Sequence, residues 1–507
     1  MPKDKSSITT VLLKKSTVVT IFTLLAVPFG YGIKMIHSRI LSPEMFGLLY
    51  AIIAFISIFK PYQDLGFNFS LSYFVPPLNK RKDLNQIGQL FSHALVATFL
   101  ISVVVAILLL VNAEWLANNY FKVAGSQILI SIFCLFILSS SITTTFKNLF
   151  IGLEKETYYS SAQIIQLATT FILSAIAFLM GITNIVTYAL IWVGGSLFVV
   201  FHYLFFVLSF HKTLLVRWHR DWKIFKKLSK FTFPYLSNQV IYFAINQTGL
   251  IFLTLFTNVT NVGVYSVILP IITIPSMFLS PLQNIFFPLI PQFMENEREK
   301  LRTLIENIFR ILPFLTLYFN FFILLFPKYT IGIFFSNQWI SAGATPLVVM
   351  SIGYIFSNVA GYLTKILDGM GLIAERMKML AVIAVANLVI GAILIYFFEV
   401  TGLVLAESLV FILTVVLMAK LIKSRIEFAL PWKFYIKYVT FLITIFILVK
   451  TLDITVNTWP VYIVFGIAYT LITVVFALTQ EAFEPHQLKL LQNQVNKVSN
   501  FIRFKRI

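Results

Sequence analysis

Four basic residues within long apolar runs of this 507-residue sequence could bind an anionic group: Lys34, Lys60, Arg310 and Lys365. A charged side chain at the centre of a membrane-spanning helix costs about 2.5–3.5 kcal/mol on insertion scales, so it usually faces a polar cavity or a partner. A cation at that depth attracts an anionic group such as a phosphate. Lys34, Arg310 and Lys365 have a second interpretation, because long side chains near the end of a span extend to the lipid headgroups. We take all four as candidate substrate-binding residues, with Arg310 and Lys365 forming a cationic entrance.

Lys60 is the deepest of these cations, roughly 21 Å into its apolar run at 1.5 Å per residue, close to the middle of a bilayer. It precedes Pro61, which is expected to kink or open the helix. Asp64 and Asn68 follow at intervals of one helical turn, so with Ser57 they predict a polar stripe. We interpret this stripe as the wall of a substrate cavity. The alternative is that Lys60 and Asp64 neutralise each other and stabilise the kink.

Polar residues in two other apolar runs are also candidates. Gln239, Tyr242 and Asn246 recur at helical spacing, and their amides and hydroxyl suit hydrogen bonds to a sugar. Hydrogen bonds between neighbouring helices are the alternative. Asp64 and Glu407 are candidates for carrying a coupling ion, although each also suits a structural polar contact.

These residues belong to a chain that is mostly apolar. Hydrophobic residues make up 59% of it and charged residues 12%, with a mean hydropathy of +0.88; a soluble domain has about 25% charged residues. A spanning helix needs about 20 apolar residues, and about fourteen runs qualify. They lie near 16–38, 46–75, 87–111, 127–149, 157–180, 184–210, 230–256, 262–290, 304–326, 342–366, 377–398, 400–421, 435–450 and 459–479.

The distribution of charge predicts the topology. Most of the 39 Lys and Arg residues fall in alternate segments between the spans, beginning with the N-terminus and ending with the C-terminal tail. Lys and Arg concentrate in cytoplasmic loops, so both termini are expected in the cytoplasm of an inner-membrane protein with an even number of spans. The net charge of +19 is then explained by loops that face anionic lipid, and no nucleic acid partner is expected.

The two halves of the chain resemble each other. Three pairs occur in the same order, namely Phe46-Gly47 with Val262-Gly263, Pro77 with Pro291, and Gly152-Leu153 with Gly371-Leu372. Each repeat holds six spans, so the repeats are parallel and a substrate path is expected between them. The predicted parts are a six-helix lobe (1–210), a basic cytoplasmic interfacial linker (211–229), a second six-helix lobe (230–425), two additional helices (426–480) and a basic amphipathic cytoplasmic tail (481–507).

Several motifs of catalysis are absent. The sequence has no GxxxxGK[ST] phosphate loop, HExxH or paired CxxC, so neither an ATPase nor a metal site is indicated and no cofactor is expected. The single cysteine, Cys134, excludes a disulfide within the chain. The predicted outer loops are short, which leaves little room for catalytic residues. These features predict that the protein is not an enzyme.

A short motif near the N-terminus consists of Arg39, Leu41, Pro43, Phe46, Gly47, Asp64 and Gly66. This motif resembles the start of the Wzx-like polysaccharide flippases, which share a superfamily with the multidrug and toxin extruders (MATE) and the lipid II flippases. The resemblance implies an all-α polytopic membrane protein with two parallel six-helix repeats in a MATE-like V, followed by two C-terminal helices. It also implies alternating access and a cationic cavity for the diphosphate of a lipid-linked oligosaccharide.

The predicted function is therefore flipping of a polyprenyl-diphosphate-linked oligosaccharide, such as an O-antigen or other surface polysaccharide repeat unit, from the cytoplasmic to the outer leaflet. Membrane lipids are expected partners, together with the polymerase and glycosyltransferases of the same pathway. One alternative is a cation-coupled multidrug exporter of the same fold. The other is a membrane glycosyltransferase or polysaccharide polymerase, which would need catalytic residues on the outer loops.

Overall fold

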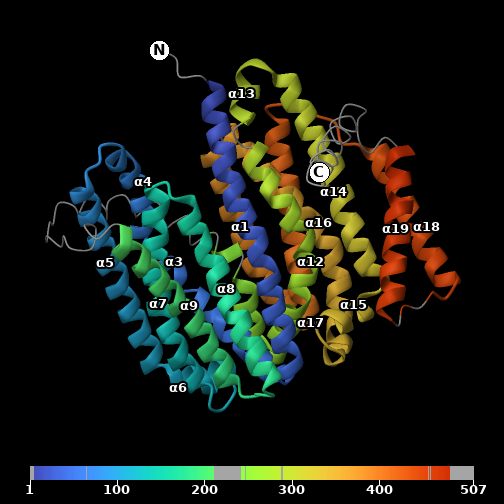
Figure 1. The fold of residues 1–507 in the computed structure, drawn as a ribbon. Helices are drawn as coiled ribbons and strands as arrows, with labels where there is room; N and C mark the ends of the chain where they lie inside the picture. Colours follow the sequence, from blue (N-terminus) through green and yellow to red (C-terminus); the bar gives the residue numbers. More distant parts are fainter. Residues whose placement is uncertain are drawn as a thin grey trace, which may run out of the picture. The chain divides into compact units, whose positions relative to one another are not determined.

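The computed structural model describes residues 5–479 except 64, 211–240, 242, 246, 287–288, 455 and 457. Every regular element in this part of the chain is a helix (Figure 1). The predicted linker 211–229 and tail 481–507 lie outside the described residues. So do the candidate site residues Asp64, Gln239, Tyr242 and Asn246.

Most helices of the N-terminal half are long and apolar; the exceptions are the four-residue α3 and a short pair after α5. The described helices of this half are α1 (Lys5–Ile40), α2 (Pro43–Ser57), α3 (Lys60–Gln63), α4 (Phe67–Lys80), α5 (Leu84–Val111), α6 (Ala113–Trp115), η1 (Leu116–Phe121), α7 (Gln127–Gly152), α8 (Glu156–Leu179) and α9 (Ile185–Phe210).

The second half repeats this pattern and adds two final helices. The described elements are α11 (Thr248–Phe256), α12 (Val259–Phe286), α13 (Leu289–Asn296), α14 (Arg298–Leu325), α15 (Pro327–Phe334), η3 (Asn337–Trp339), α16 (Ile340–Gly369), α17 (Ile373–Lys423), α18 (Trp432–Thr451) and α19 (Trp459–Thr479).

Eleven of the described helices are long and apolar enough to cross a membrane. They account for all but two of the predicted spans, because α17 covers both 377–398 and 400–421. Of the other two, the span at 46–75 is divided into α2, α3 and α4, and the span at 230–256 is described mainly by α11. The all-α polytopic prediction is confirmed.

The backbone of α17 departs from helical geometry at Glu399, where φ is 51° and ψ is −126°. Gly402 shows that the chain reverses there: a Cβ on Gly402 would overlap the carbonyl oxygen of Leu394. In a continuous helix these residues would be about 12 Å apart along the axis. The region therefore forms two helices joined by a tight turn, and Gly402 allows their close approach.

The second predicted span is interrupted near Pro61. Helix α2 ends at Ser57, and α4 begins only at Phe67. Leu65 and Gly66 have positive φ values of 43° and 84° before α4 begins. Helical spacing therefore does not continue from Ser57 to Asn68, because these two residues belong to different helices.

The described chain divides into two compact units. The first comprises Met1–Ile271, Ile331–Pro346 and Ala374–Val410, and the second comprises Ile272–Thr330, Leu347–Ile373 and Phe411–Ile507, each apart from its undescribed residues. This division cuts α12, α16 and α17 within the helix, so the lobe boundaries expected from the sequence stay predictions.

Each unit has its own apolar core. In the first unit α7 packs against α4, α5, α8 and α9, and its core includes Phe91, Phe146, Phe150 and Tyr203. In the second unit α14 packs against α18 and α19, and aromatic residues such as Phe314, Tyr438 and Tyr469 dominate the core. Burial of such large aromatic side chains is a major contribution to packing.

Candidate functional site

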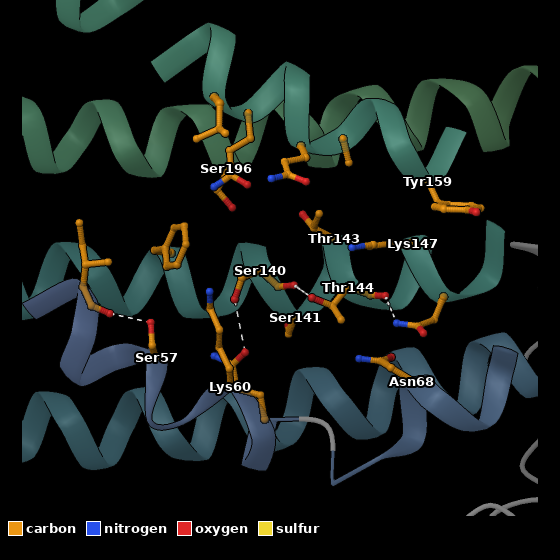
Figure 2. Close-up of a pocket in the computed structure, with 18 of the residues that line it drawn as sticks. Ser57, Lys60, Asn68, Ser140, Ser141, Thr143, Thr144, Lys147, Tyr159 and Ser196 are labelled. Atoms are coloured by element: carbon orange, nitrogen blue, oxygen red, sulfur yellow. Dashed lines mark hydrogen bonds between the residues drawn. The ribbon is translucent and has the colours of Figure 1, made fainter. Parts of the chain in front are cut away.

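A cavity of about 840 Å³ lies in the first unit. Residues from α1, α2, α3, α4, α7, α8 and α9 line it, and Phe243 and Gln247 complete it. Figure 2 shows polar side chains directed into it from α7 and from the interrupted segment α2–α4. A volume in this range is typical of small-molecule sites.

Two lysines are the charged residues among the described lining of this cavity. Lys60 begins α3, and Lys147 lies in the last two turns of α7; both line the cavity with exposed side chains. Figure 2 shows both extending into the same space. No Asp or Glu is among the lining residues that the structure describes. The described wall is therefore cationic and suits an anionic group.

The rest of the wall offers hydroxyl and amide groups. Ser140 donates a hydrogen bond to Oε1 of Gln63 at 3.4 Å, and Ser57 donates to the carbonyl of Ile53 at 2.8 Å. The Nδ2 of Asn148 donates to the carbonyl of Thr144 at 2.9 Å. These bonds fix the side chains along the wall, as Figure 2 shows.

Part of the hydrogen-bonding capacity of this wall is unused by the protein. Within the described residues, four buried polar atoms of lining residues have no partner: Gln63 Nε2, Asn68 Oδ1, Ser160 Oγ and Trp192 Nε1. A buried polar group without a partner costs about 1–3 kcal/mol. A polar occupant that bonded to these groups after small side-chain movements would recover this cost.

Three residues of the predicted stripe, Ser57, Lys60 and Asn68, line this one cavity. Lys147 is a lining residue that sequence reasoning missed, because it lies near the predicted end of its span. A signal was present: Ser140, Thr144 and Lys147 are spaced by four and three residues, which places them on one helical face.

Lys34 lies elsewhere in the first unit. Its Nζ donates a hydrogen bond to the carbonyl of Ser266 at 3.3 Å and sits 5.1 Å from the ring centre of Tyr50. One turn on, buried His37 is hydrogen-bonded to Ser174 at 3.1 Å and to the hydroxyl of Tyr50 at 3.3 Å. The structure therefore places Lys34 in a contact between α1, α2 and α12, and not among the residues that line the cavity.

The end of α1 is bound to the C-terminal end of α15 and to the segment that follows it. Arg39 donates from Nε to the carbonyl of Phe335 at 2.8 Å and from Nη2 to that of Ile333 at 2.7 Å. In return, Trp339 Nε1 donates to the carbonyl of Ser38 at 3.2 Å. Arg39, the first residue of the resemblance motif, thus has a structural role in the first unit.

The remaining candidates occupy other places. Arg310 lines a separate cavity in the second unit, and Lys365 is not among the residues that line it. Glu407 accepts a hydrogen bond from the hydroxyl of Tyr265 at 2.7 Å. Its second carboxylate oxygen is buried and has no partner among the described residues.

The fold is similar to those of two solved membrane protein structures. A structure of the lipid II flippase MurJ in an inward closed conformation matches with a TM-score of 0.71 over 92% of this chain and 99% of that one, at 16% identity. An inward-facing multidrug resistance MATE family transporter matches with a TM-score of 0.65 over 82% of this chain and 98% of that one, at 14% identity. The MATE-like fold expected from the sequence is confirmed.

The sequence comparison defines the family. Residues 12–294 match the model of the polysaccharide biosynthesis protein family, and the chain belongs to that family. It is also 23% identical over 395 residues to an uncharacterized membrane protein of Methanocaldococcus jannaschii, covering 75% of this chain and 77% of that protein. The chain is therefore a multi-pass membrane protein of a family named for polysaccharide biosynthesis.

Proposed function

We propose that the protein translocates a polyprenyl-diphosphate-linked oligosaccharide, a repeat unit of a surface polysaccharide such as O-antigen, across the cytoplasmic membrane. The observation that carries this proposal is the cavity of about 840 Å³ that presents Lys60 and Lys147 and no described carboxylate. Membership of the polysaccharide biosynthesis family supports it.

The three parts of the substrate, namely the diphosphate, the sugars and the polyprenyl chain, have different surroundings in this proposal. The lysines attract the diphosphate, whose oxygens accept charge-assisted hydrogen bonds. Side chains such as Gln163, Gln166 and Ser196 offer amides and a hydroxyl to the sugars. The polyprenyl chain stays in the bilayer, because its apolar surface gains nothing from entering a polar cavity. Release on the other side requires that the substrate stabilise inward and outward states differently.

The other residues that the sequence predicts for substrate binding remain candidates for contacts with the transported molecule. They are Lys34, Asp64, Asn68, Gln239, Tyr242, Asn246, Arg310 and Lys365. Of these, Asn68 lines the cavity. Asp64 and Glu407 stay candidates for ion coupling. The proposed direction is from the cytoplasmic to the outer leaflet, with both termini in the cytoplasm. The enzymes that build and polymerise the glycan are the proposed pathway partners.

The alternatives differ in the occupant they require. A multidrug exporter that takes cationic drugs needs a wall that is acidic or apolar, whereas the described lining has two lysines and no acid. A glycosyltransferase or polymerase would form new glycosidic bonds. Lengthening of a lipid-linked glycan by the purified protein would therefore overturn the flippase proposal.

The test measures lipid-linked oligosaccharide on the inner leaflet of cells that carry Lys60→Ala, Lys147→Ala or a full deletion. Each substitution removes charge-assisted hydrogen bonds worth about 1.5–3 kcal/mol, so transport is expected to slow about tenfold or more. The intermediate then accumulates as it does in the deletion. Lys155→Ala is the matched control: this exposed lysine follows α7 but does not line the cavity.

Protein levels in the membrane must be equal for the comparison to hold. Lys147→Arg is expected to restore most transport, because it keeps the positive charge. If the deletion itself accumulates no intermediate, the substrate assignment is wrong and the exporter alternative gains. If the deletion accumulates it but neither lysine variant does, the cavity is not the diphosphate site.

A further inference from the structure

A second cavity, of about 500 Å³, lies in the second unit between α14 and the start of α18. Arg310, Lys433 and Lys437 contribute three positive charges to its wall. The other described lining residues are Leu430, Pro431, Trp432 and Phe434, and no acidic residue is among them. Basic side chains gathered around one hollow suit an anionic group, whose oxygens accept charge-assisted hydrogen bonds.

The wall of this cavity is held by packing between the two helices. Phe434 is buried and contacts Phe314 of α14 at a ring-centre distance of 6.0 Å. The hydroxyl of Tyr438 donates a hydrogen bond to the carbonyl of Phe314 at 3.3 Å, and that of Tyr435 donates to the carbonyl of Phe309. These contacts hold α14 and α18 together, and the basic side chains of the cavity project from these two packed helices.

The nearest carboxylate on α14 is already engaged. Glu306 precedes Arg310 by one helical turn, but its Oε1 accepts from Nε of Arg302 at 3.1 Å and from the backbone N–H of Ala429 at 2.9 Å. The cavity also lies at the N-terminus of the 20-residue helix α18, where the helix dipole favours negative charge. The basic side chains and the N-terminus of α18 therefore both favour an anion in this cavity.

The surface of α18 beyond the cavity suits a lipid chain. Trp432, Ile436, Val439 and Ile443 are spaced by four, three and four residues and are all exposed, Trp432 by 63% and Ile436 by 66%. In a multi-pass membrane protein such an apolar stripe faces acyl chains. A tryptophan at the helix end is typical of the headgroup level, where aromatic residues gather. The cations thus lie beside the end of a lipid-facing stripe.

We propose that this cavity binds the phosphate headgroup of an anionic membrane lipid, with its acyl chains along the exposed stripe of α18. Basic pockets between membrane helices bind anionic headgroups by the same chemistry. The site is separate from the Lys60–Lys147 cavity, and it binds lipid whether or not the protein transports a glycan.

The test is native mass spectrometry of the full-length protein in detergent with added phosphatidylglycerol or phosphatidylcholine. Wild-type protein is expected to retain phosphatidylglycerol in preference to phosphatidylcholine. The double variant Lys433→Gln/Lys437→Gln is expected to bind phosphatidylglycerol about tenfold more weakly or worse, because charge-assisted bonds to the phosphate are lost. Arg310→Gln is expected to weaken it as well, whereas Arg310→Lys keeps most binding.

The matched control is Lys420→Gln/Lys423→Gln, which removes two exposed lysines at the end of α17 that do not line the cavity. If this control weakens binding as much, attraction is to general charge and the proposal is wrong. Equal retention of phosphatidylcholine would also overturn it. Inorganic pyrophosphate is the soluble competitor: displacement at concentrations equal to those of the lipid would show an anion site in which the acyl chains play no part, which contradicts the proposal.

Discussion

The surroundings of a lysine decide what its charge can do, as Lys34, Lys60 and Lys147 illustrate. The ammonium of Lys34 already has a carbonyl and an aromatic face as partners. Lys60 and Lys147 instead face a cavity whose described wall has no acid. An anionic substrate gains more from the second arrangement, because it does not have to displace partners that the protein provides.

Trp339 links the end of α1 to α2 through one hydrogen bond and one ring contact. It is 1% exposed, its ring packs against Phe46 at 5.0 Å, and its Nε1 donates to the carbonyl of Ser38. We expect Trp339→Ala to destabilise the protein by about 3–5 kcal/mol, through the cavity left behind and the lost bond. Thermal unfolding of the purified protein measures this.

The control for this prediction is Trp115→Ala, because Trp115 is 60% exposed. Its apparent melting temperature is expected to change little. Equal losses from the two substitutions would contradict the role assigned to Trp339. Trp339→Phe is expected to fall between wild type and Trp339→Ala, since it keeps most of the ring contact but not the hydrogen bond.

At the scale of elements, the sequence repeat has a counterpart in the packing of α2 on α12. Gly47 and Gly263 hold corresponding positions in the two halves of the sequence. In the structure they meet, because a Cβ on Gly263 would lie 3.2 Å from the Cα of Gly47. Equivalent residues contact each other where a two-fold axis passes between them. This contact therefore fits the parallel repeats inferred from the sequence.

The same crossing leads to a prediction for Gly47→Ala. A Cβ there would overlap the backbone carbonyl oxygen of Val259, which cannot move without shifting α12. We expect a clear drop in melting temperature or in the yield of folded protein. Gly194→Ala in α9 is the matched control, because a Cβ at that position meets nothing within 4 Å. Since alanine favours helix over glycine by about 0.5–1 kcal/mol, the control is expected to be neutral or slightly stabilising.

The break after α2 shows how far the sequence predicts the site. Pro61 predicts an interruption, and the interruption is present. The spacing of polar residues predicted that Ser57, Lys60 and Asn68 line a cavity, and all three line one cavity. Its premise of continuous helical spacing was wrong, because the chain between Ser57 and Phe67 is not one helix. Local spacing predicts a face only within an unbroken element.

The direction of a side chain near the end of a span could not be predicted from the sequence. Lys147 lies two residues from the predicted end of its span, where a lysine is expected to reach the headgroups. Its direction into the cavity depends on how α7 packs against α4 and α8, which is a matter of tertiary structure. The membrane spans were predicted well for the opposite reason: a continuous apolar run of sufficient length specifies a span without reference to its neighbours.

At the scale of the whole molecule, orientation in the membrane is the property on which the proposed direction of transport depends. The prediction rests on alternating basic loops. Helix α5 allows a direct check, because it runs from Leu84 to Val111, a length of about 42 Å at 1.5 Å per residue. That length exceeds the roughly 30 Å hydrocarbon core of a bilayer. Arg81 and Glu114, which flank this helix with exposed side chains, must therefore face opposite sides.

Single cysteines at these two positions determine the orientation. The natural Cys134 is buried at 3% exposure and is not expected to react. We expect Glu114→Cys to react with a membrane-impermeant maleimide in intact cells, and Arg81→Cys to react only after permeabilisation, because the basic loop faces the cytoplasm. The reverse pattern would place the termini outside and reverse the proposed direction. Reaction of both in intact cells would contradict α5 as a span, so the pair of variants tests the fold and the direction separately.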